Sequence, residues 1–180
     1  DRYQVVPTFS RGTIWQFHKN ASAMKHLMAR DFEDLLQCAM PVFEGLLPLS
    51  HNKIVLDLIF DLTVWYAYAK LWLHTNDILN FFNLETTALS QSVHKFQQKT
   101  CAGYTTTELP QEHAAHSRRA AATTAKQGQD VPVLHSGPKT KELNLCTYKY
   151  HTLGNYPDTI QCYGTTDSYS TQQVSLLKLG

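Results

Sequence analysis

The most apolar stretch of the chain is residues 54–73, where hydrophobic side chains occupy nearly every face of a predicted helix. Lys53, Asp57 and Asp61 are spaced four apart, so on a helix they share one narrow stripe. The other faces, including Trp72 and Leu73 at the far end, are expected to be buried. Charged residues inside a membrane span would each cost about 2.5–3.5 kcal/mol. The pattern therefore favours the central helix of a soluble bundle over a membrane span.

A second amphipathic helix is predicted before this one. From a cap at Asn20 or Ser22, apolar residues recur every three or four positions as far as Leu46. Pro41 is expected to kink this helix or to split it in two, because proline lacks a backbone donor. The acidic residues at positions 31, 33 and 34 are expected on its outer face.

A third helix is predicted from Thr75 to about Lys99, with Asp77 in its first turn, where a negative charge suits the helix dipole. Short turns join the three predicted helices, and helices joined in this way pack up, down and up. The predicted fold class is therefore mainly α, with a three-helix antiparallel bundle over residues 20–101.

Changes in composition predict the segments on either side of the bundle. Residues 1–19 mix proline, glycine and aromatic residues, and we expect an extended arm packed onto the core. Residues 102–142 are predicted to contain a polar, alanine-rich helix from about Glu108 to Lys126, followed by a flexible linker rich in glycine, proline and serine.

The last predicted segment, residues 143–180, has helical propensity but is interrupted by Gly154 and Pro157. We expect short helical pieces followed by a turn of glycine, threonine and serine. The chain begins without methionine and ends on an apolar run, so we interpret it as a truncated fragment.

Composition limits the classes of partner. With 180 residues, 43% hydrophobic side chains and a formal net charge of +1, the chain can bury a core but has no overall field that attracts nucleic acid or a membrane. Binding to either would need a local patch. Four cysteines lie far apart without a C-x-x-C pair, which indicates neither a zinc site nor a disulfide framework, and we interpret them as reduced and intracellular.

Two groups of residues resemble metal or acid–base sites. His113 and His116, with Glu112, lie on one helical face, but a metal would need a further ligand, and solvated histidines are favoured. Asp57 and Asp61 are also spaced for a shared face, and a solvated stripe or salt links to neighbouring helices are favoured. No nucleotide-cradle or hydrolase-elbow motif occurs, so we expect no cofactor and no small-molecule ligand, and we assign no catalytic or metal-binding residue.

The mildly basic region of the chain lies in and after the polar helix. A flexible basic strip can lie along nucleic-acid phosphates through charge alone, although a solvated linker explains the same composition. The candidate DNA-binding residues are Arg118, Arg119, Lys126, Lys139 and Lys141.

Short motifs occur in order at residues 31–38, 42–47, 101–104, 148–154 and 160–172. Taken together, they resemble the C-terminal part of Plavaka-type transposases of mushroom-forming fungi, which are related to the Kyakuja-Dileera-Zisupton group. The resemblance implies a helical region after a transposase core, a polar insert, and a lysine-histidine motif leading to a glycine and a threonine/serine-rich turn. The positions that match the family motif are Lys149, His151, Gly154, Ile160, Tyr163, Gly164, Asp167, Ser168, Ser170 and Thr171.

The chain also departs from that family. Such proteins continue with a glutamate and a histidine on one helix, whereas residues 173–180 contain neither. DNA strand transfer needs several carboxylates that converge on divalent metals, and no such set can be assembled from this sequence. No catalytic residue is therefore transferred.

Our leading hypothesis is a non-catalytic, truncated helical segment of a transposon-encoded protein, with DNA, the remainder of a transposase or a second copy as its partner, and with no membrane contact. It predicts an intracellular protein, in the nucleus if it contacts DNA. Two alternatives stay open: a helical protein-protein interaction module, and a fragment of a metal-dependent transposase or nuclease.

Overall fold

The computed structural model of the chain is mainly helical, as the sequence predicts. It describes residues 2–7, 17, 20, 21, 24, 27–126 and 137–166, with the backbone alone for residues 124–126. The chain divides into two compact units. The core unit comprises Asp1–Phe96 and Leu145–Gly180, and the insert unit comprises Gln97–Asn144.

The first predicted helix is split into α1 (Ala29–Gln37) and α2 (Ala39–Phe43), so the expected effect of Pro41 is confirmed. Pro41 has no N–H to offer the carbonyl of Gln37, and the helix is interrupted between these two residues, at Cys38.

The predicted start of this helix is wrong. Asn20 is not helical and Ser22 lies outside the described residues, whereas α1 begins at Ala29. There the backbone N–H of Met28 donates to the carboxylate of Asp31 at 2.7 Å, which satisfies one of the donors that a helix start leaves unpaired.

The expectation that all three acids of α1 face solvent is also wrong. Asp34 is only 8% exposed, and burial raises the pKa of its carboxyl. The Glu33 carboxylate accepts a hydrogen bond from the Tyr66 hydroxyl and lies 3.5 Å from the Lys70 ammonium. These contacts attach α1 to the central helix.

The central helix, α3, spans Leu49–Ala69 and ends earlier than predicted. Trp72 and Leu73, expected to be buried, are 87% and 73% exposed. The imidazole Nε2 of His74 lies 2.8 Å from the carbonyl oxygen of Tyr68, so this side chain satisfies an acceptor at the helix end. No helix in the described part of the chain has both the length and the apolar character that crossing a bilayer requires.

The third predicted helix is confirmed as α4, Asn76–Lys95, which a π-helical turn over Phe96–Thr100 continues. The hydroxyl of Thr75 accepts a hydrogen bond from the backbone N–H of Ile78 at 3.3 Å and caps the helix start.

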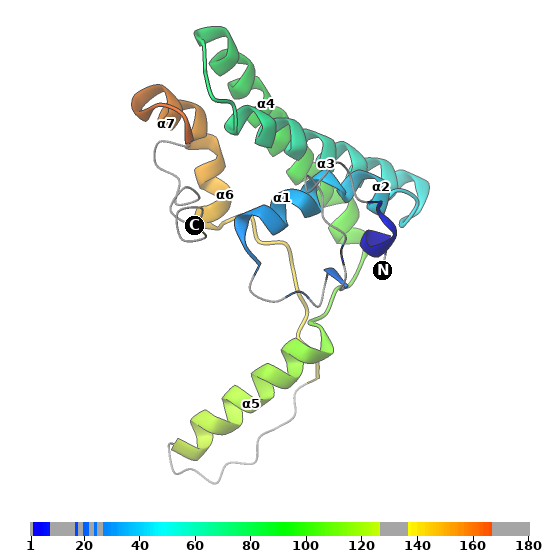
Figure 1. Cartoon of the computed structure of the whole chain (residues 1–180). Coiled ribbons are helices and arrows are strands. Elements are labelled where there is room, and N and C mark those ends of the chain that lie inside the picture. The colour runs from blue at the N-terminus through cyan, green and yellow to red at the C-terminus, as the bar shows by residue number, and fades with distance from the viewer. Residues whose placement is uncertain are drawn as a thin grey trace. The chain divides into compact units, whose positions relative to one another are not determined.

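The core lies where α3 and α4 pack side by side (Figure 1). Trp65 and Phe82 meet at a ring separation of 5.5 Å, and the Trp65 indole N–H donates to the Thr86 hydroxyl at 3.0 Å. Short helices after the insert complete this core through Ile160. They are α6 (Tyr148–His151), a 3-10 turn (Thr152–Asn155) and α7 (Tyr156–Tyr163).

The described start of the N-terminal arm is a 3-10 turn, Arg2–Val5, and is not extended. It does pack onto the helices that follow. The Arg2 guanidinium donates to the Val42 carbonyl at 3.2 Å, and the Tyr3 hydroxyl donates to the Leu35 carbonyl at 3.3 Å.

The insert unit is built from a short backbone pairing and one helix. Thr107 and Thr140 form an antiparallel β-bridge, with N–H to O=C distances of 2.9 Å from Glu108 to Lys139 and from Lys141 to Thr106. Residues 137–141 were expected in the flexible linker; Thr140 forms this bridge, and residues 127–136 lie outside the described part of the chain.

The polar helix of the insert is confirmed as α5, Pro110–Lys126. Proline suits the first position of a helix, and the Glu112 carboxylate accepts from the backbone N–H of Leu109 at 3.1 Å. Alanine has the highest intrinsic helix propensity. The alanines of this segment therefore favour a helix even though it has no apolar face that could pack against a neighbour.

Candidate nucleic-acid interface

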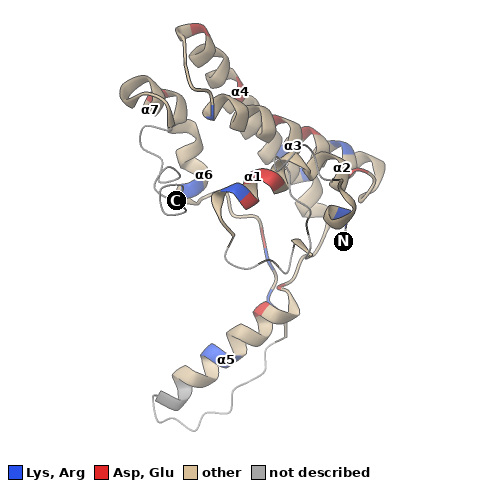
Figure 2. Cartoon of the chain, in the orientation of Figure 1, with Lys and Arg blue, Asp and Glu red and all other residues tan. Residues whose placement is uncertain are grey.

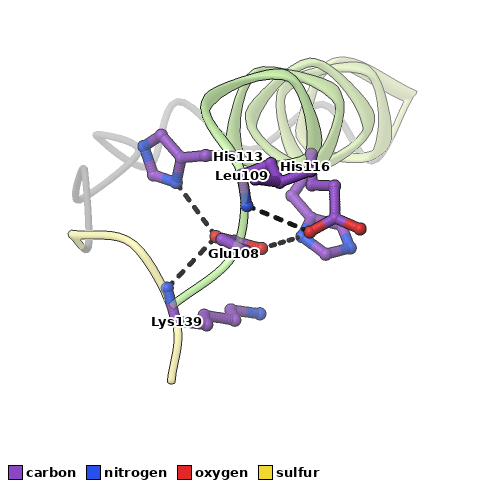
Figure 3. A network of polar contacts seen from close by, with 6 residues as sticks. Glu108, Leu109, His113, His116 and Lys139 are labelled. Carbon is purple, nitrogen blue, oxygen red and sulfur yellow. Dashed lines mark hydrogen bonds and ion pairs between the residues drawn. The ribbon is translucent and has the colours of Figure 1, made fainter. Parts of the chain in front are cut away.

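A buried carboxylate organises the start of α5. The side chain of Glu108 is 1% exposed, and each of its oxygens contacts a different histidine. Oε1 lies 3.1 Å from Nδ1 of His113, and Oε2 lies 2.7 Å from Nδ1 of His116. The backbone N–H of Lys139 donates to Oε1 at 3.2 Å (Figure 3). The Glu108 carboxylate thus joins α5 to residues 137–144 of the insert unit, called the returning segment below.

These bonds keep Glu108 ionised. The pKa of its carboxyl is lowered from 4.5 to about 2, mainly because the Lys139 N–H donates to it, and hydrogen bonds from His113 and His116 lower the pKa further against the opposing effect of burial. An ionised carboxylate only accepts hydrogen bonds, so Nδ1 of each imidazole must carry the hydrogen that it donates. Nε2, on the other side of each ring, does not contact Glu108.

The two imidazoles do not form a chelating pair. Their rings lie on opposite sides of Glu108 (Figure 3), with His113 and His116 side chains 33% and 42% exposed. Among the residues that the structure describes, no group of three His, Cys, Asp or Glu side chains is placed to hold a metal ion. The histidines are carboxylate-bound, so the expectation of simply solvated side chains is wrong.

The cations of the insert unit are exposed on its surface. Residues 118–123 of α5 are all exposed, Arg118 and Arg119 among them, and Lys and Arg positions are coloured blue on the ribbon in Figure 2. Arg118 Nε donates to the Ala114 carbonyl at 3.3 Å, which uses one of five guanidinium N–H groups. Lys139 and Lys141 are exposed on the paired segment, and the side chain of Lys126 lies outside the described residues.

No protein-family model, curated protein or solved structure matches this chain. The assignment of a function therefore depends on the geometry of its own residues and on the family resemblance already stated.

The structure describes the surroundings of several residues of the family motif, which lie on and after α6. Lys149 and His151 are exposed on α6, while Tyr150 between them bonds Ser90 at 3.1 Å. A side chain at Gly154 would meet nothing within 4 Å. Gly164 ends α7 with a φ of 87°, which favours glycine. Asp167, Ser168, Ser170 and Thr171 lie outside the described residues.

The paired aspartates of α3 are engaged by α4. Asp57 lies 3.4 Å from the Lys53 ammonium and 3.9 Å from the Lys95 ammonium. Asp61 accepts a hydrogen bond from the Ser92 hydroxyl. These contacts confirm the expected salt links to a neighbouring helix and explain the spacing without a bound metal.

An open pocket of about 570 Å³ lies within the insert unit, beside the β-bridge. Cys101 and Lys141 contribute to its lining, and burial raises the pKa of the Cys101 thiol. A raised pKa disfavours the reactive thiolate. The pocket therefore has no activated nucleophile at this cysteine.

Glu108 should make the insert unit sensitive to acid. The pKa of this carboxyl is about 2 in the fold and 4.5 as the ordinary value, so the unfolded chain binds the proton first as pH falls. Its contribution to stability is complete above pH 4.5 and is lost as pH falls towards 2. Urea unfolding of the insert unit, followed through the amide NMR signals of Leu109 and Lys139, would measure this loss. The free energy of unfolding should be lower at about pH 3 than at about pH 6.

The Glu108→Gln variant should be less stable at the higher pH and should lose this pH dependence, because its amide cannot be titrated. Glu142→Gln is the matched control, since Glu142 is exposed on the same returning segment. An unchanged acid response in Glu108→Gln would contradict the assignment of the response to Glu108.

Proposed function

We propose that this chain is a non-catalytic helical segment of a transposase-like protein and that α5 contacts DNA phosphates. The transposon origin rests on the family resemblance. DNA contact is supported by one observation: Arg118 and Arg119 are exposed within an exposed part of α5, residues 118–123, and residues 113–126 contain no acid.

The arrangement of charge favours an anionic partner. Of the two acids nearest this surface, Glu108 is buried and occupied by three donors, and Glu112 accepts from the Leu109 N–H. Among the described residues, neither carboxylate is paired with Arg118 or Arg119. Cations that are not paired within the protein can release counterions from DNA when they contact phosphates.

The small side chains of α5 also suit close contact with DNA. Residues 120–122 are alanines and are exposed. A helix with small side chains brings its backbone and neighbouring arginines close to a groove wide enough for a helix, such as the major groove of DNA. Phosphate contact of this kind fixes position and carries no sequence preference.

The double variant Arg118→Ala/Arg119→Ala tests this proposal. With a labelled duplex of about 20 base pairs, anisotropy should show binding that weakens with salt, and the variant should flatten the slope of log K against log salt by about 2, roughly 1 for each lost contact.

Lys53→Ala/Lys95→Ala is the matched control, because it removes the same charge from the core unit, where both lysines lie beside Asp57. Equal effects of the two double variants would contradict a localised interface on α5. An absence of salt-dependent binding by the unmodified protein would overturn DNA contact altogether.

A helical interaction module is the second candidate, and large exposed apolar side chains support it. Trp72 and Leu73 follow α3, and Phe81 and Leu84 are 57% and 67% exposed on α4. Light scattering that gives the mass of a dimer would favour this function. The nuclease alternative instead predicts DNA nicking that depends on Mg²⁺ or Mn²⁺.

A further inference from the structure

His113 and His116 are held in a way that lets them gain charge without rearrangement. Both direct Nδ1 to the same buried carboxylate, at 3.1 and 2.7 Å, and both side chains are partly exposed. A proton from solvent therefore adds at Nε2, on the far side of each ring, and the bonds to Glu108 stay in place. The same local structure accommodates both charge states.

The cluster of Glu108, His113 and His116 can change its net charge by two units. With both imidazoles neutral, Glu108 gives the cluster a charge of −1; with both protonated, the cluster has a charge of +1. Histidine is the side chain that ordinarily changes charge near neutral pH. Glu108 stays ionised over that range because its pKa is about 2. With the Glu112 carboxylate in the first turn counted as well, the start of α5 can therefore change from a charge of −2 to zero.

The histidines continue the face that carries an arginine. His116 and Arg119 are three residues apart on α5, as are His113 and His116, and residues three apart are neighbours on a helix surface. Glu108, on the preceding segment, contacts both imidazoles, and helical spacing places Glu112 and Arg119 of α5 near them. The returning segment contributes the backbone N–H of Lys139.

We propose that His113 and His116 extend the phosphate-contacting surface of α5, so that DNA affinity rises as these imidazoles become protonated. This inference rests on the proposed DNA contact and adds two binding residues and a dependence on pH. Each protonated imidazole presents an Nε2–H donor of the kind that binds phosphate oxygen strongly.

The decisive variant is His113→Asn/His116→Asn. The asparagine amide nitrogen can replace Nδ1 as the donor to Glu108, but it cannot gain a proton near neutral pH. The matched control is His94→Asn/His151→Asn, which removes two exposed histidines of the core unit.

Anisotropy with the same duplex would be measured at about pH 6 and about pH 8 and at fixed ionic strength. The unmodified protein and the control should bind roughly tenfold more tightly at the lower pH, with a salt slope steeper by about 1–2. The decisive variant should have the same affinity at both values, equal to that of the unmodified protein at the higher pH.

A measurement on the unmodified protein gives an independent test. Because binding and protonation are linked, DNA should move the NMR titration midpoints of the His113 and His116 rings to higher pH and leave His94 unchanged. Unmoved midpoints, or a pH response that persists in His113→Asn/His116→Asn, would overturn the inference while DNA contact stands. No binding at either pH would overturn the proposed function itself.

Discussion

The Phe82→Ala variant is expected to lower the free energy of unfolding of the core unit by about 3–5 kcal/mol. Phe82 has no exposed surface, and its ring lies 5.5 Å from that of Trp65 and 5.8 Å from that of Tyr68. Truncation removes a large buried apolar surface and leaves a cavity that the surrounding helices can only partly close. Urea unfolding followed by tryptophan fluorescence would measure the change.

Phe81→Ala is a control of identical chemistry one residue away. Phe81 is 57% exposed on the same helix, so its truncation should change stability by less than about 1 kcal/mol. If the two variants lost similar stability, the face of α4 that packs against α3 would be wrongly assigned.

The helices that could be predicted are those whose pattern is periodic and whose ends are determined locally. α4 is an example, because Thr75 caps the helix with its own hydroxyl and apolar residues recur at helical spacing from Ile78 onwards. The break near Pro41 was also predictable, since proline interrupts a helix through its own covalent structure.

The end of α3 could not be predicted from periodicity. The apolar pattern continues through Trp72, but His74 folds back to the Tyr68 carbonyl and the helix stops at Ala69. Asp34 was misassigned for a similar reason. Its burial depends on packing between segments, which an amphipathic pattern within one helix does not contain.

The candidate interface was partly visible in the sequence. The spacing of His113 and His116 and the adjacent arginines indicated a polar, basic helix. The role of Glu108 was missed because its Lys139 partner is 31 residues away in the sequence. An acid two residues before a proline that starts a helix, with histidines in the first turns, was the available signal.

The Ile160→Ala variant is expected to lower the free energy of unfolding of the core unit by about 2–5 kcal/mol. Ile160 lies on α7, is 3% exposed, and belongs to the same buried cluster as Trp65, Phe82 and Leu89. The whole insert separates α7 from α4 in the sequence. A large loss would show that the segment after the insert is part of the core and does not merely cover it.

Graded substitutions separate this packing effect from a local effect on α7. Ile160→Val removes one methyl group and should cost about 0.5–1.5 kcal/mol. Tyr163→Ala truncates a side chain that is 75% exposed on the same helix and should change stability by less than about 1 kcal/mol. The Trp65 and Tyr156 rings are 4.9 Å apart, so fluorescence of the buried indole should report the loss directly. If Ile160→Ala frayed α7 and left the Trp65 transition unchanged, α7 would be a separate, weakly attached element.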